Sequence, residues 1–77
     1  ARLEVKYIQA LSAIEAGFQS SVRAPGRIEI YSLSGRCIYS GFADPAEKKI
    51  LIIHGKGLYI VRLITGEWVE CQKVCVQ

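Results

Sequence analysis

The sequence has no methionine, only two prolines, and a single histidine and tryptophan among its 77 residues. Without a methionine the chain cannot begin at its own start codon, so we expect residues 1–77 to be one domain excised from a longer protein. No apolar run approaches the roughly 18 residues that span a bilayer, and no charged start precedes an apolar stretch. We therefore expect no stable membrane insertion and no signal peptide within these residues.

Charge of one sign is not concentrated anywhere in the chain. Ten basic and seven acidic residues give a net charge of +3. Residues 1–43 carry five basic and three acidic residues, against five and four in residues 44–77. Nucleic-acid-binding domains usually gather basic side chains on one face or helix. The even spread indicates no nucleic-acid partner.

Residues suited to metal or covalent chemistry are few. His54 is the only histidine, no Cys-x-x-Cys pair accompanies it, and Gly55-Lys56-Gly57 lacks the spacing of a phosphate loop. No acid, base and nucleophile can be assembled into a set. We therefore expect no catalytic residues, no metal site, no cofactor, and a protein that is not an enzyme.

The cysteines are three in number, so they cannot all pair within one chain. Cys71 and Cys75 are four residues apart on an expected strand, roughly 13 Å along its axis, which is beyond the reach of a disulfide. Cys37 could pair with either of them across neighbouring strands. Two alternatives stay open: three small packed apolar side chains, or one cross-strand disulfide.

What the sequence has in abundance is apolar residues, 51% of the chain, carried by isoleucine, valine, leucine and tyrosine. Alternating or continuous apolar residues predict strands at residues 3–8, 12–16, 27–33, 36–40, 47–53, 58–64 and 68–76. Residues 9–18 would also suit helical turns, but the run is too short to be a stable helix alone, so we interpret 12–16 as a short strand. Turn or loop signals separate them at Gly17, Pro25-Gly26, Ser34-Gly35 and residues 41–46, 55–57 and 65–67. This spacing without a convincing helix predicts an all-β fold, a small antiparallel immunoglobulin-like β-sandwich of about seven strands.

The stretch 58–64 is the most apolar of these strands. Alternation places two sets on its opposite faces: Tyr59, Val61 and Leu63, and Leu58, Ile60 and Ile64. Because both faces are apolar, we expect this strand near the middle of the domain with cover on both sides. Residues 50–53 are also wholly apolar, so we expect them to be deeply buried.

Tyr59 and Trp68 could each have a structural or a functional role. Tyr59 is expected in the core, with its hydroxyl bonded to a nearby backbone group, as tyrosines near strand starts are in other sandwiches. Trp68 is expected to pair across strands at a hairpin mouth or, alternatively, to stack on a sugar or a partner. Val74 and Val76 indicate a docked last strand, so removal of the last five residues should threaten the fold.

Three segments follow one another in order: Ile30-Tyr31-Ser32-Leu33-Ser34-Gly35-Arg36, Gly57-Leu58-Tyr59-Ile60-Val61-Arg62-Leu63, and Gln72-Lys73-Val74-Cys75-Val76. Together they resemble the C-terminal sorting domain of cargo of the type IX (Por) secretion system of the Bacteroidota. In that family a Tyr-x-Leu-x-Gly-Arg hairpin, a Gly-x-Tyr-x-Val strand and a Lys-containing final strand occur at about these separations. The resemblance covers residues 27–77, about two thirds of the chain.

The resemblance implies a non-catalytic, folded export signal. The parent protein would fold in the periplasm, cross the outer membrane because the type IX translocon recognises this domain, and end at the cell surface or be released. In many members a sortase then replaces the domain with an anionic lipopolysaccharide, so translocon and sortase components are the implied partners. The motif residues carried over are Gly35, Gly57, Tyr59, Lys73, Val74 and Val76. Lys73 and the exposed part of the last strand are the candidates for direct contact.

The alternative is a generic immunoglobulin-like accessory module of a secreted protein, which spaces its neighbours or binds glycan. The two hypotheses differ in position, because a spacer tolerates sequence after it whereas a sorting signal should end the polypeptide. Long terminal strands would also allow a strand-exchanged or edge-paired homodimer.

Overall fold

The computed structural model describes residues 2–19, 26–45, 47–66 and 69–77. These residues form seven strands and one short 3-10 helix: β1 (Arg2–Ile8), η1 (Gln9–Leu11), β2 (Ala13–Gln19), β3 (Gly26–Ser32), β4 (Cys37–Ala43), β5 (Lys49–Ile52), β6 (Gly57–Ile64) and β7 (Val69–Val76). The predicted all-β fold is confirmed. Among the described residues there is no helix of the length and apolarity needed to cross a membrane.

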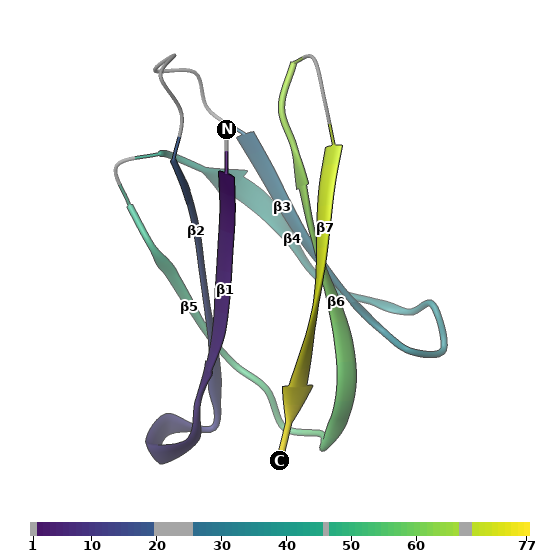
Figure 1. Ribbon diagram of the computed structural model, residues 1–77. Helices are drawn as coiled ribbons and strands as arrows, with labels where there is room; N and C mark the ends of the chain where they lie inside the picture. The colour runs from purple at the N-terminus through teal and green to yellow at the C-terminus, as the bar shows by residue number, and fades with distance from the viewer. Residues whose placement is uncertain (1, 20–25, 46, 67–68) are drawn as a thin grey trace.

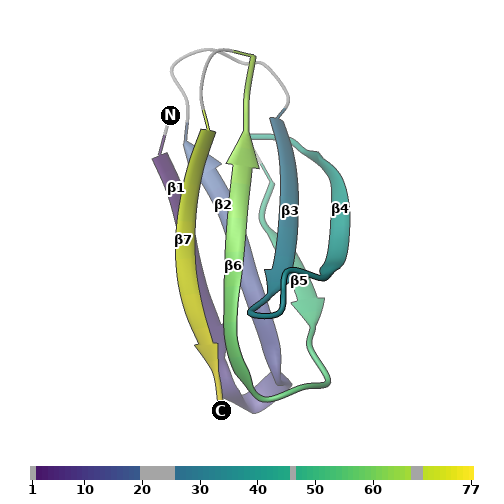
Figure 2. The same cartoon turned by 90° about the vertical axis from the view of Figure 1, so that its right-hand side faces the viewer.

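The strands form two antiparallel sheets that pack face to face (Figure 1). One sheet has the order β1-β2-β5 and the other has the order β4-β3-β6-β7. This is the arrangement of an immunoglobulin-like sandwich whose fourth strand joins the second sheet instead of the first. The end of β6 and the start of β7 lie at one end of the sandwich, and the C-terminus lies at the other (Figures 1 and 2).

The core fills the space between the sheets because side chains alternate along each strand. From β6, Tyr59, Val61 and Leu63 are all buried on the inner face, as predicted. They join a cluster drawn from both sheets: Leu3, Ile14, Ala16, Phe18, Ile28, Ile30, Ala43, Ile53, Val74 and Val76.

The expectation of cover on both faces of β6 was wrong, although β6 does lie inside its sheet between β3 and β7. Its outer side chains, among them Leu58, Ile60 and Ile64, are only half-buried. They are shielded by neighbouring strands and not by a second layer. Arg62 shares this face, which marks it as the solvent side.

The strand edges of β1 and β7 are joined by side chains. The backbone N–H of Leu3 donates to Glu70 Oε2 at 2.9 Å, and Gln72 Nε2 donates to the Leu3 carbonyl oxygen at 2.6 Å. The Tyr7 hydroxyl donates to the carbonyl oxygen of Gln77 at 2.9 Å. An edge strand normally leaves such backbone groups unpaired. Here both backbone groups of Leu3 have partners from β7.

Two expected boundaries were wrong. Gly17 does not end its strand but lies inside β2, opposite Glu4 on β1. A glycine fits there because an added Cβ would lie 3.1 Å from Cγ of Lys48. Residues 41–43 are not loop either, since β4 continues to Ala43, which is buried. A glycine suits position 41 of this strand because an added Cβ would overlap the hydroxyl of Tyr39.

The expected burial of residues 50–53 was wrong for half of them. Ile50 and Ile52 are 54% and 64% exposed, whereas Ile53 is 8% exposed and Leu51 is half-buried. The cause is that β5 is an edge strand with only one face toward the core. Pro25, Glu67 and Trp68, on which other turn and binding expectations rested, lie outside the described residues.

Candidate functional site

The motif residues of the three segments gather at one end of the four-stranded sheet. Gly57 is paired with Val76, and Tyr59 is paired with Val74, in the β6–β7 ladder. On its other side Tyr59 is paired with Ser32 at the end of β3. Ser32 in turn begins the β3–β4 turn, in which the N–H of Gly35 donates to the Ser32 carbonyl oxygen at 2.9 Å. Segments far apart in the sequence therefore meet at one place.

Tyr59 is the centre of this group. Its ring is 8% exposed, and its hydroxyl donates a hydrogen bond of 2.8 Å to the carbonyl oxygen of Gly55, four residues earlier. This is the tyrosine corner of immunoglobulin-like sandwiches, in which a tyrosine near the start of this strand bonds the preceding backbone. The prediction for Tyr59 is confirmed.

The two motif glycines have backbone conformations that a side chain would strain. Gly35 has a φ of 91° and Gly57 a φ of 131°. Both values lie in the region that residues with a Cβ rarely adopt. Gly35 closes the β3–β4 hairpin, and Gly57 begins β6. Their roles are thus to shape the chain.

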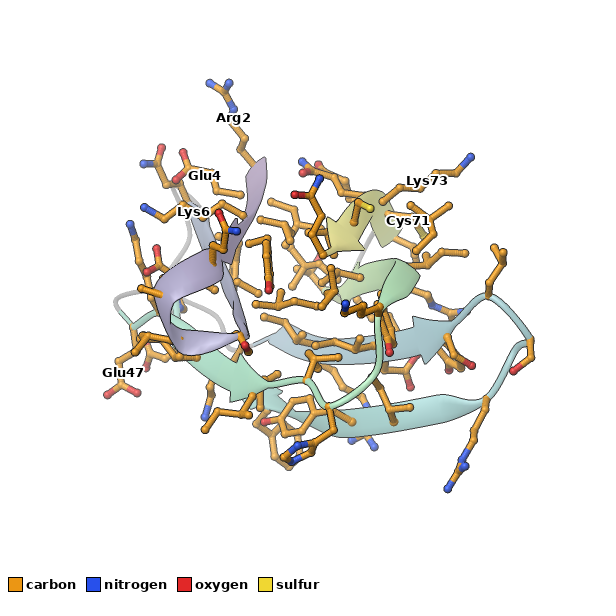
Figure 3. The ribbon with its side chains drawn as sticks, turned by 90° about the horizontal axis from the view of Figure 1, so that it is seen from below. Arg2, Glu4, Lys6, Glu47, Cys71 and Lys73 are labelled. Atoms are coloured by element: carbon orange, nitrogen blue, oxygen red, sulfur yellow. The ribbon has the colours of Figure 1, made fainter. Side chains whose placement is uncertain are left out.

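The remaining motif residues lie on opposite faces of β7. Val74 and Val76 point into the core and are 8% and 4% exposed. Lys73 is exposed on the outer face, opposite Ile60, and extends away from the sandwich (Figure 3). Lys73 is therefore the one charged residue of the motif, and it is accessible to a partner.

All three cysteines are free and exposed, so neither expected alternative holds. Cys37 is on β4 and the other two are on β7, at opposite edges of one four-stranded sheet. A cross-strand bond from Cys37 to either is therefore excluded by the strand order. Cys71 and Cys75 are not packed in the core because they share the outer face of β7 with Lys73.

An ion cluster occupies the outer face of β3 and β6. Glu29, whose side chain is 15% exposed, lies 3.6 Å from Nε of Arg27 and 3.5 Å from Nε of Arg62. The Tyr31 hydroxyl donates to Glu29 Oε1 at 3.0 Å. This hydrogen bond, with smaller effects of burial and of the carboxylate charge, raises the pKa of Tyr31 above its ordinary value of 10.0.

A surface groove of about 360 Å³ adjoins the motif residues. Tyr59 and Ile53 are its most buried lining residues, Ile38 and Ile52 flank it, and Arg36 and His54 lie at its rim. Sequence reasoning missed this groove because its lining comes from the β3–β4 turn, β4, β5, the β5–β6 loop and β6. The one signal available was the continuous apolar run of residues 50–53, which predicts deep burial and not a groove.

His54 is on this rim and is not part of a metal-binding group. Among the residues that the structure describes, no three histidine, cysteine, aspartate or glutamate side chains come together in a way that could hold a metal ion. The described site offers an exposed arginine, an apolar groove and one exposed lysine.

No family model matches the chain, and no curated protein and no solved structure matches it either. The fold defines the class to which the chain belongs: a small antiparallel β-sandwich of seven described strands.

Proposed function

We propose that this domain is a folded, non-catalytic sorting signal that directs its parent protein across the outer membrane through a type IX secretion system. One observation supports the proposal most: residues Gly57, Tyr59, Val74 and Val76, which carry the resemblance from separate segments, are direct neighbours in the β6–β7 ladder. A set of residues that act together needs such proximity.

The burial of these residues suggests how such a signal works. Tyr59 and the two valines are buried at the end of the sheet, and the two exposed glycines have positive φ values there, so these residues act by specifying the fold. Lys73 is exposed beside them on the outer face. In the proposal a translocon component binds the folded end of the sheet and contacts Lys73. The cargo then passes from the periplasm to the cell surface.

A secretion assay tests this proposal. Residues 1–77 are fused behind a periplasmic reporter in a bacterium with a working type IX system and in a matched strain without the translocon. We expect the reporter at the cell surface only in the strain with a working type IX system. Lys73→Glu should retain the reporter in the periplasm, because it reverses the exposed charge of the motif.

Lys6→Glu is the matched control. Lys6 is on the outer face of the other sheet, its side chain is 67% exposed, and its 3.8 Å contact with Glu15 is a surface ion pair of small energetic weight. This variant should still reach the surface. Circular dichroism and protease resistance of each purified domain show whether it is folded. Retention of the folded, unsubstituted fusion in the periplasm would overturn the proposal and favour an accessory module.

A further inference from the structure

The two lateral edges of the sandwich differ. At one edge β1 and β7 are joined by the hydrogen bonds of Leu3 with Glu70 and Gln72. At the opposite edge β4 and β5 lie on the same side of the molecule but belong to different sheets (Figure 2). Among the described residues of β4 and β5, no hydrogen bond joins the two strands. This second edge therefore offers unpaired backbone groups.

Of these two strands, β5 is the better template for an added strand. The β3–β4 ladder shifts register between Ile30 and Tyr31, and such a bulge bends the strand and disrupts its pairing. β5 pairs with β2 in unbroken register from Ile52 to Lys49. Its outward side chains Ile50 and Ile52 are more than half exposed, so an added strand could cover them.

The groove beside β5 has one formal positive charge. Arg36 is exposed in its lining, and its described lining includes no acidic side chain. Its volume of about 360 Å³ lies near the lower end of the range for small-ligand sites, roughly 300–1,000 Å³. It therefore has room for a few side chains, with an acidic group favoured next to Arg36.

We propose that the β4–β5 edge binds an extended peptide segment that adds a strand to β5 and places an acidic side chain against Arg36. Main-chain hydrogen bonds to β5 would supply affinity, and the groove would select the side chains. An extended peptide fits better than an anionic lipid, because only the peptide satisfies the backbone groups of the strand edge. The inference does not depend on the export proposal.

Fluorescence anisotropy with the purified 77-residue chain tests this inference. The probe is a labelled hexapeptide that alternates valine and threonine around one central aspartate. We expect saturable binding that weakens about tenfold or more when lysine replaces the aspartate. Arg36→Glu should weaken binding by a similar factor, whereas Lys6→Glu, an equal change of charge on β1, two strands from β5 and outside the groove lining, should not.

Two further probes separate strand addition from other modes of binding without changing the protein. The same peptide with an N-methyl group on every residue has no backbone N–H to donate from either edge, so it cannot form a full ladder and its binding should be lost. Decanoate, an anionic amphiphile without a peptide backbone, should not compete. Equal binding of the N-methylated peptide, displacement by decanoate, or unchanged binding by the Arg36→Glu variant would each overturn the proposal. So would the absence of saturable binding by the aspartate peptide.

Discussion

The Tyr59 hydroxyl and the carbonyl oxygen of Gly55 are 2.8 Å apart, and a Cβ added to Gly55 would lie 2.8 Å from that same hydroxyl oxygen. The hydrogen bond of Tyr59 therefore depends on a glycine at position 55. The tyrosine holds the turn before β6 closed, and it can do so only because residue 55 has no side chain. This explains the glycine in the turn, because the backbone of residue 55 must come close to the Tyr59 hydroxyl.

A double-mutant cycle measures this relationship. Tyr59→Phe should cost about 0.5–1.5 kcal/mol of unfolding free energy, because one hydrogen bond is lost. Gly55→Ala should also destabilise the protein, since the new Cβ collides with the hydroxyl. In the Tyr59→Phe background the same alanine should cost less, because the colliding oxygen is gone. Urea unfolding of the four proteins gives the coupling energy, and strictly additive costs would contradict this account.

Periodicity and turn residues were enough to predict the sandwich. Tyr59, Val61 and Leu63 alternate with less buried residues, and the expected inner face is the observed one. Ser34-Gly35 also marked the β3–β4 turn correctly. These features are local, because alternation and turn conformations depend on a few adjacent residues.

Strand order could not be derived from local pattern, and the errors follow from that. The four apolar residues of 50–53 fit a central strand equally well, but β5 is at an edge and exposes Ile52. In the same way, a bond from Cys37 to β7 was plausible until the order β4-β3-β6-β7 separated them. The groove beside Arg36 could not be predicted for the same reason, because the residues that line it come together only in the folded chain.

The join between β1 and β7 predicts a local effect on stability. Gln72→Ala removes the amide that donates to the Leu3 carbonyl oxygen at 2.6 Å, so we expect a cost of about 0.5–1.5 kcal/mol. Amide hydrogen exchange of Leu3 should accelerate, because the edge of β1 opens more often. The control is Lys73→Ala, a change on the outer face of the same strand, which should stay within about 0.5 kcal/mol of the parent. Equal effects of the two variants would contradict a role for the Gln72 bond.

The last strand should be required for folding through its inward side chains. Val76 is 4% exposed in the core, so Val76→Ala should destabilise the protein by about 1.5–3 kcal/mol. Cys75→Ala changes an exposed neighbour and should have little effect. Deletion of residues 73–77 removes both buried valines and the pairing with Gly57 and Tyr59, and should leave the chain unfolded by circular dichroism. A cooperative thermal transition in the deletion variant would disprove this.

The raised pKa of Tyr31 predicts a loss of stability at alkaline pH. The folded state favours the protonated hydroxyl, which donates to Glu29. Its contribution is complete below the unfolded pKa of 10.0 and is lost as the pH rises through the higher folded value. Above pH 10.0 the unfolding free energy should therefore fall less steeply with pH in the Tyr31→Phe variant than in the parent protein. In an ultraviolet titration the parent protein should have one tyrosine that ionises at higher pH than the others, and the variant should lack it. Identical titration curves would refute the raised pKa of Tyr31.

The cysteines give a prediction about accessibility in the folded state. Cys37, Cys71 and Cys75 are free and exposed, so a small disulfide reagent should titrate three thiols without denaturant. Each serine variant, such as Cys37→Ser, should lower the number by one and leave the urea midpoint nearly unchanged, because an exposed thiol contributes little to packing. Denatured protein provides the control for the total. Fewer than three thiols in the folded monomer, with three in denaturant, would show that at least one sulfur is shielded and that the faces assigned to β4 or β7 are wrong.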